Sequence, residues 1–249
     1  MLNRDRIVSQ LNDSHYVRGL ILDDCTDSTN LNVKEMAQKG AAEGVTMIVD
    51  RQTGGRGRLG RSFHSPEGGL YLSTLLRPAD PNPGRITCCA AVAAARAIES
   101  LCDASVDIKW VNDLYVNGRK AAGILAEGVF SPAGELTAAV LGIGINVGVT
   151  DFPDELIPIA TSLGNEGFAL AREDVAAAFL NALPIALVDP TAMEEYRRRN
   201  LVLGRAVTVV RGNETFVATP EAITDEGHLI LRTADGVATL SSGEVSLRL

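Results

Sequence analysis

The segment that most constrains the fold covers residues 51–69 and reads RQTGGRGRLGRSFHSPEGG. Gly55, Gly57 and Gly60 match the G-x-G-x-x-G pattern of dinucleotide-binding folds, and the stretch from Gly55 to Ser62 differs from a P-loop by one residue. Both motifs require a helix directly after the glycines, because the helix N-terminus faces the phosphate. Here a turn-rich segment follows, and then a second strand-like run, GLYLSTLLR. The order strand, glycine loop, strand therefore argues against both nucleotide-binding folds.

Two further residues weaken these motifs, and the charge of the loop suggests another role. Arg61 stands where a P-loop has lysine, and Asp80, the candidate acid of the dinucleotide motif, lies in a proline-rich breaker. Residues 51–66 contain four arginines and no acid, in a chain whose net charge is −8. Arginines bind carboxylates and phosphates, and glycines let the backbone approach a ligand closely. The pattern predicts a loop that grips an anion; a solvated surface loop is the alternative.

The composition is that of a globular protein with an aliphatic core. The chain has 249 residues, of which 46% are hydrophobic, 22% charged and 4% aromatic. Its acidic balance, with a pI near 5.0, argues against non-specific binding of nucleic acids or membranes. The four cysteines form no C-x-x-C pair and the three histidines are scattered, which argues against a zinc site or a disulfide framework. With neither a signal peptide nor a membrane-length apolar run visible, we expect a cytoplasmic protein.

The hydrophobic pattern changes at Leu201. Before it, helical and strand-like segments are mixed, which predicts an α+β domain over residues 1–200. After it, short apolar runs separated by turn residues every eight to twelve positions predict a small β-barrel over residues 201–249. Helices are predicted over 1–12, 28–40, 86–102 and 172–183 and from Asp189 onward, and strands over 45–50, 69–77, 106–110, 113–116, 119–127 and 135–147.

A second polar cluster, KWVNDLYVNGRKAAGILAE, covers residues 109–127. Lys109 ends one predicted strand, Asn112–Asp113 begins the next, and Lys120 follows a hairpin turn. A glycine inside a strand, here Gly123, often marks the close approach of a ligand. Each feature has a structural alternative: Trp110 as a core residue, Lys120 as a solvated charge and Asn112–Asp113 as a turn.

Taken together, these segments resemble the biotin–protein ligases, also called biotin–[acetyl-CoA-carboxylase] ligases. The resemblance runs from about residue 22 to the C-terminus and rests on DSTN (27–30), RQTGGRGRLGRSF (51–63), GLYLS (69–73), KWVND (109–113), RKAAGIL (119–125), GIGIN (142–146) and SGEVSLR (242–248). It implies an α+β fold, with a mixed β-sheet catalytic domain of the class II aminoacyl-tRNA synthetase/biotin ligase type and then a small SH3-like β-barrel. Because only about twenty residues precede the match, we expect a form without an N-terminal DNA-binding domain.

The resemblance implies a reaction in two steps. The biotin carboxylate attacks the α-phosphate of ATP to form biotinyl-5′-AMP, and a lysine of a biotin carboxyl carrier protein then receives the biotin while AMP leaves. Mg²⁺ would bind through the ATP phosphates, with no confident side-chain ligand. By resemblance, the catalytic residues are Lys109, Arg56 and Arg58; the biotin-binding residues are Ser28, Thr29, Asn30, Gln52, Arg56, Gly57, Arg58, Lys109 and Gly123; and the nucleotide-binding residues are Arg58, Arg61, Phe63, Asn112 and Asn146. Gly142 and Gly144 resemble the adenine-side wall, Asp113 is a weaker candidate for a base or for orienting the amine, and Ser28 has helix capping as an alternative role.

Two positions depart from the family pattern, since Phe63 stands where tryptophan is usual and Val111 where proline is usual. Two rival functions remain: a lipoate or octanoate ligase or transferase of related fold, and a non-catalytic biotin-binding module. The KWVND–AGIL pair and the C-terminal barrel favour biotin. The expected partner is the carrier domain of a biotin-dependent carboxylase, with no nucleic acid or membrane, and the expected state is a monomer or a homodimer.

Overall fold

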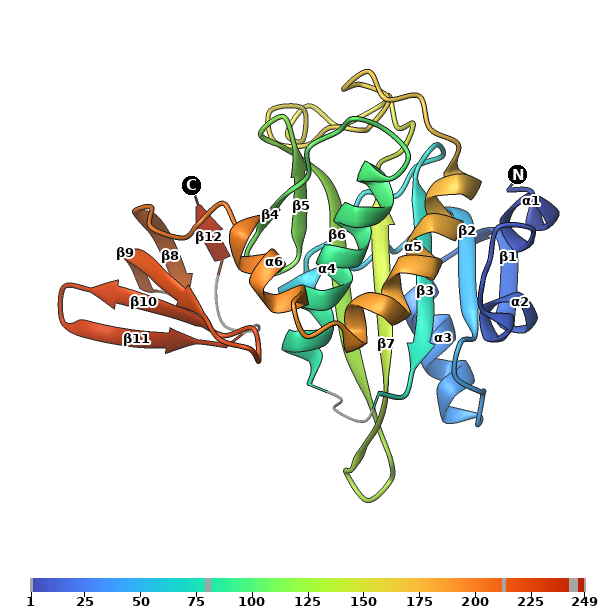
Figure 1. Cartoon of the computed structure of the whole chain (residues 1–249), viewed down its shortest axis with the longest axis horizontal. Coiled ribbons are helices and arrows are strands. Elements are labelled where there is room, and N and C mark those ends of the chain that lie inside the picture. Colours follow the sequence, from blue (N-terminus) through green and yellow to red (C-terminus); the bar gives the residue numbers. More distant parts are fainter. Residues whose placement is uncertain (1, 79–81, 212–213, 242–245, 249) are drawn as a thin grey trace.

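The computed structural model describes residues 2–78, 82–211, 214–241 and 246–248. Asp80 and most of the SGEVSLR segment lie outside the described residues. A seven-stranded mixed sheet, in the order β1-β2-β3-β7-β6-β5-β4, forms the centre of the molecule (Figure 1). Its strands are β1 (Leu20–Thr26), β2 (Thr46–Gln52), β3 (Leu70–Leu76), β4 (Asp107–Lys109), β5 (Asp113–Val116), β6 (Arg119–Phe130) and β7 (Leu136–Ile145).

Strands β2 to β7 lie where the sequence predicts them, and β1 is an addition. β1 runs parallel to β2, whereas the other neighbouring pairs are antiparallel. Only Leu20 of β1 is buried. An edge strand with this little burial lacks the alternation of apolar and polar residues by which a strand is predicted.

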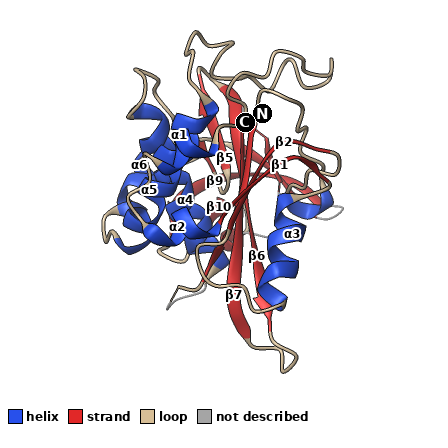
Figure 2. Cartoon of the chain, turned by 90° about the vertical axis from the view of Figure 1, so that its right-hand side faces the viewer, coloured by secondary structure: helices blue, strands red, loops and turns tan. Residues whose placement is uncertain are grey.

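Helices cover the two faces of the sheet unequally (Figure 2). They are α1 (Arg4–Val8), α2 (Ser14–Gly19), α3 (Thr29–Gln38), α4 (Pro83–Glu99), α5 (Arg172–Val188) and α6 (Ala192–Arg198). The larger core joins α4, α5 and α6 to one face, and the alanines of α4 are fully buried there. On the other face α3 packs through Val33 against Val49 and Leu75. Because α3 is short, part of this second face stays uncovered.

Several helices differ from their predictions. The helix predicted over residues 1–12 covers only Arg4–Val8, and α2 is an addition. Helix α4 begins at Pro83, earlier than predicted, because the side chain of Asn82 accepts hydrogen bonds from the next backbone N–H groups and caps it. Helix α5 continues through Pro184 to Val188 instead of ending before the proline. Among the described residues, no single helix is long and apolar enough to cross a membrane; only α5 and α6 taken together, across a bend of 110°, have the required length and composition.

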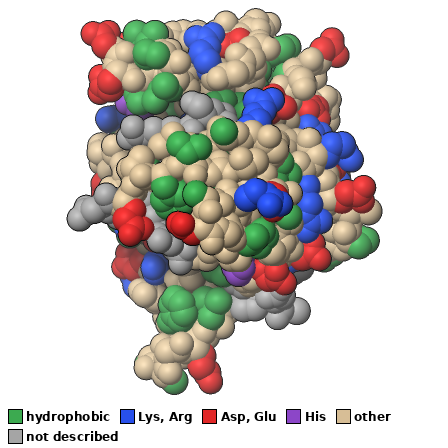
Figure 3. All heavy atoms as spheres, turned by 90° about the vertical axis from the view of Figure 1, so that its left-hand side faces the viewer, with side chains coloured by type: hydrophobic (Ala, Val, Ile, Leu, Met, Phe, Trp, Pro, Cys, Tyr) green, Lys and Arg blue, Asp and Glu red, His purple; other side chains and the backbone are tan. Residues whose placement is uncertain are grey.

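The last part of the chain forms a separate antiparallel sheet of five strands, in the order β11-β10-β9-β8-β12. These are β8 (Val207–Arg211), β9 (Glu214–Ile223), β10 (Leu229–Thr233), β11 (Gly236–Leu240) and β12 (Ser246–Arg248). On the side of the molecule that carries this sheet, acidic and basic side chains are interspersed (Figure 3). The predicted α+β fold with a small C-terminal β unit is confirmed; the exact division at residue 200 remains a prediction.

Candidate active site

A cavity of about 180 Å³ opens on the sheet face that α3 leaves uncovered. The sheet forms its floor, the N-terminal end of α3 forms one end, and the loop of residues 53–66, called the lid below, forms its cover. The lining residues are Ser28, Thr29, Asn30, Gln52, Arg56, Gly57, Arg58, Leu59, Arg61, Ser62, Phe63, Lys109, Trp110, Asn112, Asp113, Lys120, Gly123, Ile124, Leu125, Gly142, Ile143 and Gly144. Every predicted site residue except Asn146 therefore borders one cavity.

The floor is flat because strand register places glycines side by side. Gly123 on β6 lies opposite Gly144 on β7, and Gly142 follows on the same face of β7. The ring of Phe63 lies against this floor: a Cβ added to Gly144 would lie 2.4 Å from the ring, and one added to Gly123 would lie 3.0 Å from it. A side chain at either glycine would displace Phe63, which explains why these strands carry glycines here.

One end of the cavity is a closely hydrogen-bonded polar cluster. The backbone N–H and the hydroxyl of Thr29 both donate to Gln52 Oε1, at 2.9 and 3.1 Å. The buried hydroxyl of Ser73 lies 2.6 Å from both Thr29 Oγ1 and Asn30 Oδ1. Ser28 occupies the N-cap position of α3, but its side chain makes no capping hydrogen bond. The Ser28 hydroxyl therefore does not cap α3, contrary to the alternative role that the sequence suggests.

The lid is a tight hairpin between β2 and β3. Gly57 N donates to Arg61 O at 2.7 Å, and Phe63 N donates to Gly55 O at 2.8 Å. A Cβ added to Gly55 would lie only 2.4 Å from the carbonyl oxygen of Phe63, so the two arms of the lid approach each other through glycine. Because Arg56, Arg58 and Arg61 of the lid also line the cavity, the geometry favours the anion-gripping loop over the solvated-loop alternative.

The lid arginines point to different walls. Arg58 donates to Asn112 Oδ1 at 3.1 Å, and its guanidinium lies 6.0 Å from the centroid of the Trp110 ring. Burial lowers the pKa of Arg58 below its usual value, and the nearby Asp113 carboxylate partly offsets this effect. Arg56 is more exposed, and its guanidinium lies 3.5 Å from the carboxylate of Glu127. Arg58 is thus fixed in the cavity wall by protein contacts, whereas Arg56 makes a longer contact with its partner.

Two lysines face the lid from the opposite wall. Burial lowers the pKa of Lys109 from 10.5; the Asp113 carboxylate opposes this shift, and the positive charges of Lys120 and Arg61 add to it. Lys120 pairs with Asp113 at 2.7 Å, and its ammonium lies 5.7 Å from the centroid of the Phe63 ring. The sequence leaves open whether Lys120 is only a solvated hairpin charge. The β5–β6 pairing shifts register next to Lys120, and the side chain of Lys120 lines the cavity. In the sequence, the glycine in the AGIL run that follows Lys120 is the feature that points to a ligand site here.

Two other predicted residues have distinct positions. Trp110 is buried as a core residue would be, and it also borders the cavity. Asn146 does not line the cavity; it is buried, and its side-chain amide donates to Thr161 O at 2.9 Å. The nucleotide-binding role of Asn146 therefore remains a prediction without geometric support.

Comparison with known proteins agrees with this architecture along most of the chain. Residues 22–146 match the Biotin/lipoate A/B protein ligase family, and residues 202–248 match the Biotin protein ligase C terminal domain. The chain belongs to the biotin protein ligase family.

Individual relatives of this ligase cover most of its length. It is 36% identical over 247 residues to the bifunctional ligase/repressor BirA of Bacillus subtilis, across 92% of the chain and 74% of the relative. It is 34% identical over 235 residues to the biotin–[acetyl-CoA-carboxylase] ligase of Mycobacterium tuberculosis, across 88% and 85%. The biotin protein ligase from Aquifex aeolicus in complex with biotin and ATP superposes with a TM-score of 0.80 at 30% identity, covering 93% of this chain and 99% of that one. The family prediction is confirmed.

Proposed function

We propose that this protein activates biotin with ATP as biotinyl-5′-AMP and transfers the biotinyl group to a lysine of a carboxylase carrier protein. The observation that carries the proposal is the cavity itself. Five cationic side chains border it, and a neutral hydrogen-bonding cluster closes one end. Such a site fits a molecule with a carboxylate at one end and an uncharged polar ring at the other.

The first step brings two anions together. At a separation of about 4 Å and an effective dielectric constant near 20, two like unit charges repel by about 4 kcal/mol. The cations Arg56, Arg58, Lys109 and Lys120 line the cavity and offset this repulsion. The carboxylate oxygen then attacks the α-phosphorus, and pyrophosphate leaves with the electron pair of the broken P–O bond. Fixed cations that face the developing charge need no reorganisation during this step.

The uncharged end of biotin fits the polar cluster. Thr29, Asn30 and Gln52 offer hydroxyl and amide groups to the ureido ring, while Gly123 and Gly142 provide a flat floor for the rest of the ring system. Ser28 and Gly57 border the same space. This arrangement orients the carboxylate of biotin toward the cationic part of the cavity.

The nucleotide occupies the part of the cavity near Arg61, Phe63 and Asn112. The ring of Phe63 offers an apolar face for adenine, although it lacks the indole N–H of the usual tryptophan. No cluster of three or more His, Cys, Asp or Glu side chains that could hold a metal ion occurs in the described part of the chain. Asp113, the carboxylate that lines the cavity, is already paired with Lys120. These residues do not form a magnesium site, so Mg²⁺ would be bound by the ATP phosphates.

The second step transfers the biotinyl group. The neutral amine of the carrier lysine forms an amide bond with the acyl carbon, the bond to AMP breaks, and AMP leaves with its electron pair. Asp113 lies at the cavity wall and can orient the amine, while the lid shields the anhydride from water.

We assign both steps of the reaction to residues 1–200 and treat residues 201–249 as the C-terminal domain. The cytoplasmic location and the monomeric or homodimeric state stay predictions.

The proposal is tested by incubating the protein with ATP, Mg²⁺, biotin and a purified carrier domain, followed by detection with streptavidin. We expect labelling of the carrier that requires ATP, and none on a carrier whose acceptor lysine is replaced. Biotin binding without labelling would favour the non-catalytic module. Parallel thermal-shift measurements with biotin, lipoate and octanoate separate the rivals, because stabilisation by lipoate or octanoate alone would contradict the proposal.

A further inference from the structure

Glu127 does not line the cavity, yet its carboxylate contacts Asn30 of the polar cluster and Arg56 of the lid. The residue is on β6, and its side chain is 18% exposed. One carboxylate oxygen accepts a hydrogen bond from the amide of Asn30 at 2.8 Å. The other lies 3.5 Å from the guanidinium of Arg56 and 3.9 Å from the ammonium of Lys34. Glu127 borders a second cavity of about 260 Å³, which shares lid residues 56–59 with the first.

A chain of polar contacts runs from Glu127 around the closed end of the cavity to the other arm of the lid. Its members, in order, are Arg56, Glu127, Asn30, Ser73, Thr29, Gln52, Ser65 and Phe63, with Thr29 joined to Gln52 through its backbone N–H. Every link except the first is a hydrogen bond between 2.6 and 3.0 Å. Both arms of the lid are therefore attached to the residues that would hold the biotin ring.

We propose that Glu127 is a positioning residue that couples Asn30 at the biotin end of the cavity to Arg56 of the lid. A ring bound at Asn30 fixes that amide and, through it, the carboxylate of Glu127. The carboxylate in turn holds Arg56 over the adenylate. The inference rests on the proposed function, because it assigns to Glu127 the retention of the intermediate formed between the two steps.

The two contacts of Glu127 can be separated by substitution. Glutamine has the same shape and keeps an oxygen that accepts from Asn30, but it has no charge to attract Arg56. Alanine removes both contacts. If Glu127 only stabilised the fold, neither variant would alter the release of the intermediate independently of biotin affinity.

The experiment uses the full chain and measures the dissociation rate of preformed biotinyl-5′-AMP, together with KM for biotin. For Glu127→Gln we expect dissociation about fivefold faster and KM within about twofold of the wild type, since a partly exposed ion pair has an effect of this size. For Glu127→Ala both quantities should rise. Glu135→Gln removes an equal charge from the exposed β6–β7 hairpin and should change neither. Unchanged dissociation in Glu127→Gln would overturn the inference, whatever its melting temperature.

A double-mutant cycle tests whether Glu127 acts through Arg56. Arg56→Met should itself speed dissociation, and adding Glu127→Gln should then have no further effect. An equal acceleration by Glu127→Gln in both backgrounds would overturn the coupling. Failure of the proposed function is distinguishable, because the wild type would then form no adenylate from biotin and ATP.

Discussion

Lys109 and Lys120 contribute two ammonium groups to one wall of the cavity, in different surroundings. Lys120 has a carboxylate partner at 2.7 Å, whereas Lys109 lies 5.8 Å from the centroid of the Tyr115 ring and its pKa is lowered by burial. The negative charge of a bound biotin carboxylate would raise the pKa of Lys109 and so oppose the effect of burial. A bound anion near Lys109 would therefore favour its protonated form.

This difference predicts how adenylate formation depends on pH. The protonated form of Lys109 is the useful one, and its pKa lies below 10.5, so the rate should fall as pH rises through that lowered value. Arginine at this position stays charged throughout. We expect Lys109→Arg to move the alkaline limb of the rate to higher pH, measured as pyrophosphate release between about pH 7 and 10. The absolute rate of the variant is not the readout; an alkaline limb identical to that of the wild type would contradict the prediction.

At the residue scale, the sequence predicts those contacts that follow directly from neighbouring positions. The charges of the loop after a strand predict that it grips an anion, whereas the roles of Gln52, Arg56 and Arg58 follow from the resemblance to the family. Lys120 and Glu127 could not be assigned, because their places depend on a register shift and on pairing across β6. A single sequence specifies alternation along a strand but not which residues face each other across a sheet.

The lid functions as an element because its two arms pack against each other without side chains. A Cβ added to Gly54 would lie 1.9 Å from the side chain of Asp27, and one added to Gly55 would lie 2.4 Å from a backbone oxygen. A side chain can rotate away, whereas a backbone oxygen moves only with its strand. Gly55 is thus the lid position where a side chain would disturb the backbone most directly.

Gly55→Ala should therefore open the lid while leaving the core intact. We expect KM for biotin to rise about tenfold, the scale of overpacking by one methyl group. Gly148→Ala is the matched comparison, because this glycine does not line the cavity and its Cβ would meet the nearest atom at 3.6 Å, an ordinary contact. Steady-state kinetics and melting temperatures of both variants provide the check. Equal effects of the two substitutions on KM would show that close packing of the arms is not the cause.

At the scale of elements, the sequence predicts six strands of the central sheet and misses one edge strand, β1. Strands β2 and β3 are mostly buried and rich in apolar residues, so the strand–loop–strand order is visible in the sequence. The prediction ends the apolar helix α5 just before Pro184, because proline usually ends a helix, whereas the helix continues to Val188. Burial of Phe179, Leu183 and Ala186 in the core holds the helix together on both sides of the proline.

At the scale of the whole molecule, α6 joins the cavity wall to the C-terminal sheet. The hydroxyl of Tyr196 donates to Val111 O at 2.9 Å, which fixes the loop between Lys109 and Asn112. Arg197 donates to Ile223 O at 2.6 Å, at the end of β9. Trp110 donates in turn to Gly227 O at 2.9 Å. The position of the cavity wall therefore depends on the C-terminal sheet, although none of the described residues of that sheet lines the cavity.

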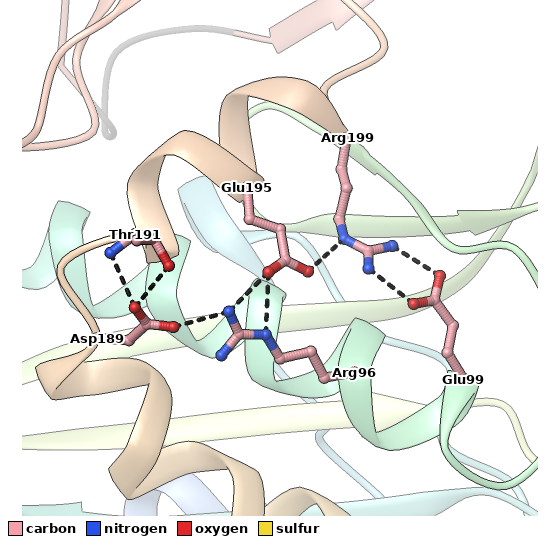
Figure 4. Close-up of polar contacts among 6 residues, drawn as sticks. All are labelled: Arg96, Glu99, Asp189, Thr191, Glu195 and Arg199. Carbon is pink, nitrogen blue, oxygen red and sulfur yellow. Dashed lines mark hydrogen bonds and ion pairs between the residues drawn. The ribbon is translucent and has the colours of Figure 1, made fainter.

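An ionic network holds α6 against α4 (Figure 4). Glu195 accepts from Arg96 at 2.7 and 3.0 Å and from Arg199 at 2.9 Å. Arg199 also donates to both oxygens of Glu99, at 2.6 and 2.7 Å. Burial alone would raise the pKa of Glu195, but the hydrogen bonds from the two arginines outweigh it and lower the pKa below 4.5. Glu195 is thus the carboxylate that links both arginines on α6 and α4.

Glu195→Gln should weaken this junction in a pH-dependent way. A carboxylate with a lowered pKa stabilises the fold fully above its unfolded value, near 4.5, and loses that contribution as pH falls through the folded value. At pH 7 we expect the variant to lose about 2 kcal/mol, because hydrogen bonds to charged groups are of this size, which corresponds to a melting temperature lower by about 4–8 °C. The difference from the wild type should shrink below about pH 4.5, where the wild-type carboxylate itself becomes protonated. Glu194→Gln, at an exposed position on the same helix, removes the same charge and should melt like the wild type at both pH values. A difference that persists unchanged in acid would mean that the shape of Glu195, and not its charge, holds α6 in place.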